Sequence, residues 1–260
     1  MIIKRVAQAL RNQDWFAFVV EILVVIIGLM LAFQLDRWWE QRGDRAQEAQ
    51  YVARLIVDIG TDIEAFEYAV DLQTVRLEMA DLLMDVVVDP EVATHRPVEF
   101  LGAVLQSTFL YTPILTTHTF EDLRSTGNMR LMRSSGIKDL LHDYYGYEAN
   151  QRQFHAIWFP KEIHHLKIAS GITSHEQDRF IQENWVFFRP QDMEQVRDAE
   201  YDLDSVRASV ERFLGRQEFV DWLPQTRQMQ LLQIRRNESI LEKANALQEK
   251  LSEYLDSIEP

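Results

Sequence analysis

The chain has 260 residues, a formal net charge of −14 at pH 7 and no cysteine. The missing cysteines exclude disulfide bonds and thiolate chemistry. Charges are nearly balanced over residues 1–42, so the acidic excess lies in the rest of the chain. Such a surface repels nucleic acid and anionic headgroups, and we expect no nucleic-acid partner.

Residues 15–35 form the most apolar stretch of the chain, WFAFVVEILVVIIGLMLAFQL, broken only by Glu21 and Gln34. A helix of this length extends roughly 31 Å, enough to cross the hydrocarbon core of a bilayer. The stretch is too long for a typical signal-peptide core, and no A-x-A-like site follows it. We expect a retained signal anchor, with a short cytoplasmic segment at 1–14, the transmembrane helix at 15–35 and a helical body at 36–260.

Basic residues flank this predicted span on both sides. Lys4, Arg5 and Arg11 precede it, while Arg37 and Arg42 follow it. A short basic N-terminus with a long acidic segment behind the span favours a cytoplasmic N-terminus. We therefore expect the C-terminal body to be extracytoplasmic.

One face of the predicted span carries a carboxyl group and small residues. Glu21, Gly28 and Ala32 lie within about 40° of one another at 100° per residue. Val25 lies between them. Because small residues allow close approach and a carboxyl group in lipid seeks a polar partner, these four residues predict a helix–helix contact. In the alternative interpretation Glu21 only marks the inner interface and the span covers residues 18–39.

The next segment predicts a long amphipathic helix. Between residues 44 and 88 apolar residues recur at steps of three and four, without a proline. This helix could be continuous with the span. Residues 89–97 carry two prolines and predict a connection, after which Pro97 suits the first turn of a helix that runs to about residue 110.

The middle of the body predicts shorter helices. Residues 111–119 form a second connection, and Gly127 fits the end of the helix that follows, with positive φ. Ser134 or Ser135 then caps a longer helix that runs toward Trp158.

The last helix is expected from about Pro224 to residue 258, after helical pieces near 177–188 and 204–214. Its apolar positions alternate steps of four and three, as in a coiled coil or helical bundle: Ile240, Ala244, Leu247, Leu251, Tyr254 and Ile258. No segment has the period of a strand. We expect an all-α fold, with one N-terminal transmembrane helix and an elongated helical-bundle domain whose long amphipathic first and last helices pair.

Two segments also follow a recognisable pattern. Residues 21–38 read Glu-Ile, an apolar run, Ile-Gly, Ala-x-Gln and Asp before Trp; residues 120–145 read aromatic-x-x-Leu-x-Ser-x-Gly-x-x-x-Leu, then a segment that ends in Tyr-Tyr. Together they resemble a bacterial family of uncharacterised single-span membrane proteins. The resemblance implies an anchor in the bacterial cytoplasmic (inner) membrane and a helical body. That family has no established activity.

No motif predicts catalysis, a cofactor or a metal. The chain has no G-x-S-x-G and no phosphate-binding glycine loop. His155, His164 and His165 lie near Glu148 and Glu162, but His164 and His165 are adjacent and so point about 100° apart. We expect these histidines to be surface or partly buried residues with hydrogen-bond partners, and we expect no enzyme.

These features favour a membrane-anchored helical interaction or scaffold protein that self-associates or joins a membrane complex. The alternative is a sensory domain that binds a small ligand and signals through a partner subunit. A group of aromatic residues fits either a core or a ligand pocket between helices: Trp158, Phe159, Trp185, Phe187, Phe188 and Trp222.

Overall fold

The computed structural model describes residues 15–258, without the side chains of residues 15–19, 21, 148–153 and 155. Every regular element in this part of the chain is a helix, so the expected all-α class is confirmed. The elements, in chain order, are α2 (Trp15–Val88), α3 (Val92–His95), α4 (Pro97–Gln106), α5 (His118–Ser125), η1 (Asn128–Arg130), α6 (Ser135–Tyr145), α7 (Tyr147–Ala169), α8 (His175–Asn184), η2 (Pro190–Asp192), α9 (Met193–Asp198), α10 (Leu203–Leu214) and α11 (Gln217–Ile258).

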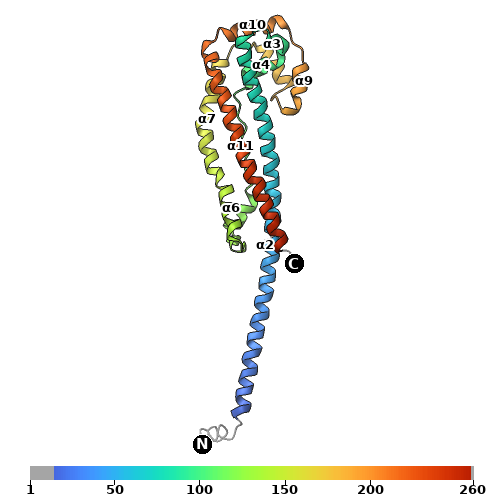
Figure 1. Ribbon diagram of the computed structural model, residues 1–260, viewed down its shortest axis with the longest axis vertical. Coiled ribbons are helices and arrows are strands. Elements are labelled where there is room, and N and C mark those ends of the chain that lie inside the picture. The colour runs from blue at the N-terminus through green and yellow to red at the C-terminus, as the bar shows by residue number, and fades with distance from the viewer. Residues whose placement is uncertain (1–14, 259–260) are drawn as a thin grey trace.

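The helix α2 is continuous over 74 residues and runs the length of the molecule (Figure 1). At 1.5 Å per residue it is roughly 110 Å long. The expected helix at 44–88 is therefore joined to the apolar N-terminal segment without a break, across Gly43 and Gly60. Part of this helix, from residue 22 on, is long and apolar enough to cross a membrane.

The expected pairing of the first and last long helices is present, since α11 packs along the upper part of α2 (Figure 1). The predicted start of α11 near Pro224 is wrong by seven residues, because the helix begins at Gln217. A proline removes a single backbone donor here. Burial of Phe219 and Leu223, which both precede Pro224, holds these first turns helical.

The body buries two hydrophobic clusters along the α2–α11 pair. The far core gathers residues 75–86 of α2 with α3, α4, α8 to α10 and the start of α11. The near core gathers residues 51–66 of α2 with α5, α6 and residues 240–251 of α11. Between the two cores the long helices bury a polar layer: Gln73, Arg76, Gln230, Gln233 and Asn237.

A segment without regular secondary structure, residues 107–117, joins α4 to α5 and lies beside this polar layer; we call it the extended segment. The Gln230 side chain donates to the carbonyl of Ser107 at 2.8 Å, and Asp62 accepts from the Thr116 amide at 2.8 Å. Backbone polar groups inside a protein need such partners when no helix or strand supplies them. The polar residues of α2 and α11 therefore supply hydrogen bonds to backbone groups of this segment. Apolar side chains at the same positions would leave those backbone groups without partners.

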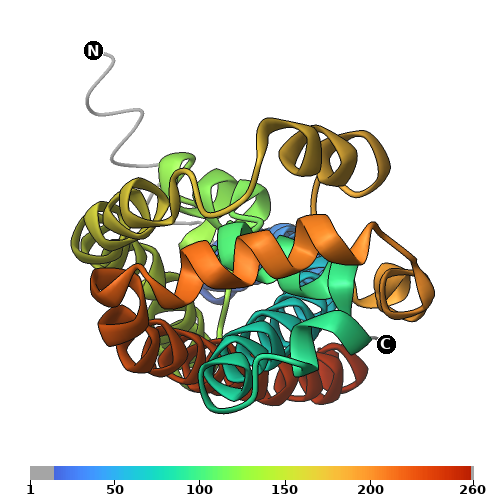
Figure 2. The same cartoon turned by 90° about the horizontal axis from the view of Figure 1, so that it is seen from above.

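Several expected helix ends are confirmed. Pro97 occupies the first turn of α4, Gly127 has φ of 75°, and the Ser134 hydroxyl accepts from the Ile137 amide to cap α6. The piece expected near 177–188 begins earlier, because Ser174 and Gln177 form a capping box at the start of α8. Seen from above, α10 crosses the far end of the body (Figure 2).

Candidate functional site

Val25, Gly28 and Ala32 of the predicted contact face contact no other helix in the described part of the chain. Val25 is 56% exposed, Ala32 is also exposed, and a Cβ added to Gly28 would meet no heavy atom within 4 Å. The side chain of Glu21 lies outside the described residues. The described residues of the body therefore leave Val25, Gly28 and Ala32 uncovered.

The histidines near Glu162 have structural partners. His165 is fully buried, its Nε2 lies 3.0 Å from the Val104 carbonyl, and its Nδ1 lies 3.4 Å from the Thr226 hydroxyl. These partners assign the proton to Nε2, and burial lowers the pKa of His165 to about 4. Glu162 and His165 have the i, i+3 spacing of helical metal sites, yet Glu162 accepts from the backbone amide of Leu110 at 2.7 Å.

No group of three histidine, aspartate or glutamate side chains that could hold a metal ion occurs in the described part of the chain. His164 packs its ring against Trp222, with the centroids 4.6 Å apart. The side chain of His155 lies outside the described residues. The arrangement around these histidines is thus that of a helix contact.

The aromatic residues grouped by sequence do not form one cluster. Phe188 is fully buried in the far core, and Trp185 and Trp222 pack against that core. Phe159 and Phe187, two other members of this group, are about half exposed. The structure therefore divides the group, and Phe187 lines a pocket.

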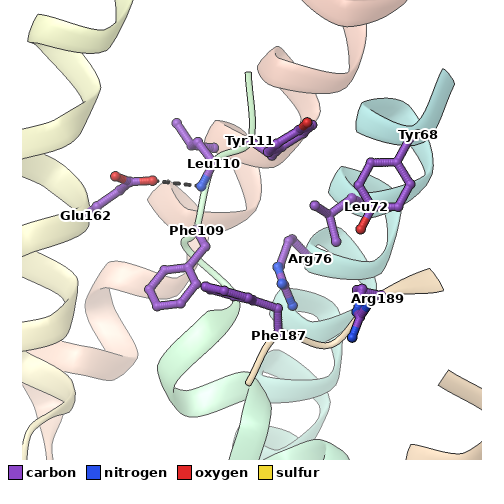
Figure 3. Close-up of a pocket in the computed structure, with 9 residues that line it drawn as sticks. All are labelled: Tyr68, Leu72, Arg76, Phe109, Leu110, Tyr111, Glu162, Phe187 and Arg189. Carbon is purple, nitrogen blue, oxygen red and sulfur yellow. Dashed lines mark hydrogen bonds between the residues drawn. The ribbon is translucent and has the colours of Figure 1, made fainter. Parts of the chain in front are cut away.

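That pocket lies in the body where α2, α7 and the extended segment meet, and has a volume of about 410 Å³ (Figure 3). This volume is within the range of small-molecule sites. Its lining comes from α2, from the extended segment, from α7 and from the connection after α8: Tyr68, Leu72, Arg76, Phe109, Leu110, Tyr111, Glu162, Phe187 and Arg189. We call it the Arg76 pocket.

Two aromatic pairs form much of its wall. The rings of Tyr68 and Tyr111 meet edge to face, with centroids 5.8 Å apart, and those of Phe109 and Phe187 do so at 6.4 Å. Such contacts hold each ring in a defined orientation. The wall is therefore largely aromatic and is shaped by four rings from three different segments.

Arg76 lies at the inner end of the pocket and is 2% exposed. Its Nη1 lies 3.5 Å from the sulfur of Met79, which is a weak acceptor. No carboxylate among the described residues lies within 4.0 Å of it, in contrast to Arg96, which pairs with Glu99 at 2.6 Å. Burial lowers the pKa of Arg76 to about 10, against a smaller opposite effect of Tyr68, so the guanidinium is charged at neutral pH.

A second hollow, of about 680 Å³, lies at the lower end of the body, where the last turn of α11 meets α2. Its lining includes Arg42, Arg45 and Arg133 together with Trp38. The Arg42 guanidinium lies over the Trp38 ring, 5.5 Å from its centroid. The acidic body is thus locally basic at the end nearest the apolar segment.

Comparisons of the chain with protein-family models, with curated proteins and with solved structures give no match. The family resemblance of residues 21–38 and 120–145 therefore stays a prediction. Any statement about function must rest on the geometry of this chain.

Arg76 was not among the residues singled out from the sequence, although the sequence holds a signal for it. Phe66, Gln73 and Ala80 follow one another at steps of seven on the buried stripe of α2, and Arg76 lies between the last two. Two polar residues at core positions of an amphipathic helix interrupt its apolar stripe. That interruption marks the polar layer.

Proposed function

We propose that this protein is a single-span protein of the bacterial cytoplasmic membrane, with an elongated helical-bundle body outside the cytoplasm, that acts as an interaction or scaffold protein. The observation that carries the proposal is the exposure of α2 over residues 22–39, where every large apolar side chain is at least 43% exposed. A soluble protein buries such a stretch, whereas lipid covers it in a membrane.

The lower end of the body supports the same placement. Trp38 and Trp39 follow the apolar segment directly, and tryptophans favour the headgroup level of a bilayer. Arg42, Arg45 and Arg133 lie beside them around the lower hollow. This arrangement fits a body whose base contacts headgroups while its acidic remainder stays in water.

We further propose that the span self-associates through the face of Glu21, Val25, Gly28 and Ala32. Small residues four apart let two helix backbones approach, and an added Cβ at Gly28 would meet no atom of the described residues within 4 Å. Because α2 is continuous, a contact in the membrane sets the spacing of two bodies directly. A scaffold needs this kind of rigid connection.

Chemical crosslinking of the full chain in native membranes, with a reagent that does not require cysteine, tests self-association. Gly28→Leu adds a side chain whose Cβ meets no heavy atom of the described residues within 4 Å, so we expect a loss of crosslinked dimer to reflect a clash with a partner helix. The double change Ile26→Leu and Met30→Leu on the opposite face is the matched control. Equal crosslinking of all three proteins would contradict the proposed contact face.

A second candidate function is ligand sensing through a partner subunit, and the Arg76 pocket favours it. Tyr68, Leu72 and Arg76 belong to the same helix as the span. A ligand in the pocket therefore contacts the element that enters the membrane.

A further inference from the structure

We infer that the Arg76 pocket binds a small organic carboxylate with an apolar body. This names the ligand class for the second candidate function and does not depend on self-association of the span. The inference rests on one buried cation, on the rings around it and on the charges at the edge of the pocket.

The first argument is the environment of the cation. A guanidinium that is 2% exposed is costly to bury unless an anion compensates its charge. The described part of the chain places only the Met79 sulfur at hydrogen-bonding distance from it. Figure 3 shows the Arg76 side chain reaching into the pocket toward Phe187, where a bound carboxylate could accept two hydrogen bonds from the planar fork.

The second argument is the shape and polarity of the wall. The Tyr68–Tyr111 and Phe109–Phe187 pairs present ring surfaces to the same space as the guanidinium. An inorganic anion would leave these rings uncovered. An apolar body attached to the carboxylate would cover them, and a site of this kind combines apolar lining with few polar groups that fix orientation.

The third argument is the charge of the ligand. Arg189 at the pocket edge already pairs with Asp192 at 3.2 Å, and Glu162 contributes a carboxylate on the side opposite Arg76 (Figure 3). A dianion would be repelled by Glu162 and Asp192, whereas a monoanion is matched by Arg76 alone. The geometry therefore selects a carboxylate over a doubly charged phosphate.

The test is calorimetric titration of the full chain in lipid nanodiscs, with empty nanodiscs as the blank. The probe is 3-phenylpropionate, compared with the neutral 3-phenylpropanamide and the cationic 3-phenylpropylamine. We expect the carboxylate to bind about tenfold or more tightly than the amide, because a hydrogen bond to a charged group contributes about 1.5–3 kcal/mol. Equal affinity for carboxylate and amide, or no saturable binding of the carboxylate, would overturn the inference.

Octanoate in the same titration distinguishes two sources of the ligand. Tighter binding of octanoate than of 3-phenylpropionate supports the site and indicates an acyl chain, as released from lipid. Tighter binding of 3-phenylpropionate supports the site and indicates an aromatic acid from solution.

Variants separate a binding role of Arg76 from a structural one. Arg76→Met keeps much of the side-chain length, and we expect it to weaken 3-phenylpropionate binding at least about tenfold without lowering the melting temperature of the ligand-free protein. Arg235→Met, at an exposed arginine of α11, is the matched control and should bind like the original chain. Unchanged binding by Arg76→Met would overturn the inference.

Two further variants keep the result interpretable. If Arg76→Met does not fold, Phe187→Ala replaces a side chain that is 54% exposed and should still weaken binding; unchanged affinity there would overturn the inference. Gly28→Leu should bind 3-phenylpropionate normally. The ligand site and the proposed self-association can therefore fail independently.

Discussion

The lower and upper parts of α2 belong to one uninterrupted helix but differ in the burial of their apolar side chains. From residue 22 to 39 the large apolar side chains are exposed, whereas from residue 51 to 86 all of them except Val57 are buried or partly buried. The lower part contains the residue types of a protein core, but no other described part of the body buries them. Helical structure alone therefore says little about where stability resides, because packing supplies most of it.

The strongest test of this contrast is the replacement of one phenylalanine by alanine in each part of α2. Phe66→Ala removes a fully buried ring from the near core and should destabilise the body by about 3–5 kcal/mol. Phe33→Ala removes a ring that is 64% exposed and should leave the unfolding of the body unchanged. Thermal unfolding of the full chain in nanodiscs measures both. A comparable loss in the two variants would mean that the lower part of α2 folds with the body.

The anchoring of the extended segment to α2 gives the next largest effect. Asp62 accepts from the Thr116 amide and the Tyr144 hydroxyl, each at 2.8 Å. Asp62→Ala leaves both donors without that acceptor and should destabilise the body by about 2 kcal/mol in chemical unfolding.

Asp62→Asn is the matched control for that variant. Burial raises the pKa of Asp62, so ionisation of the buried carboxyl carries a cost at neutral pH that the amide avoids. The amide also keeps an acceptor oxygen. We therefore expect a smaller loss for Asp62→Asn than for Asp62→Ala, and the reverse order would contradict this assignment.

The pH dependence of the body should reflect His165. Its folded pKa of about 4 lies below the ordinary value of 6.5, so the neutral form is favoured by folding. Stability from this residue is complete above pH 6.5 and is lost as the pH falls from 6.5 to 4, by up to about 3 kcal/mol. As the pH is lowered from 6.5 to 4, the melting temperature should fall less steeply in His165→Gln than in the original chain, and an equal slope in the two proteins would contradict this assignment.

The sequence predicted those features that depend on local pattern. Apolar periodicity gave the long helices and their pairing, and Pro97, Gly127 and Ser134 marked helix ends that the structure confirms. Local pattern placed the start of α11 too late, because burial of Phe219 and Leu223 outweighs the effect of one proline.

The Arg76 pocket could not be predicted in the same way. Its rings come from α2, from the extended segment and from the connection after α8, so they meet only through tertiary contacts. The sequence contains the interruption of the apolar stripe at Gln73 and Arg76, but it does not show that every carboxylate in the described part of the chain lies beyond ion-pairing distance of the guanidinium. The predicted contact face of the span, in contrast, follows from helix geometry alone, because its residues lie at fixed angles around a single helix.

The smallest expected effect on stability comes from replacing one glycine in each part of α2 by alanine. Gly43 has open space around an added Cβ, whereas at Gly60 the Cβ would lie 3.1 Å from Nε2 of Gln248. Gly43→Ala should strengthen the exposed helix locally by up to about 1 kcal/mol, which amide exchange near residue 43 would detect while the melting of the body stays constant. Gly60→Ala gains the same propensity but displaces the Gln248 side chain, so its net effect on melting should be near zero. If Gly43→Ala instead raised the melting temperature of the body, the two parts of α2 would unfold as one cooperative unit, and the contrast between them would be one of burial only.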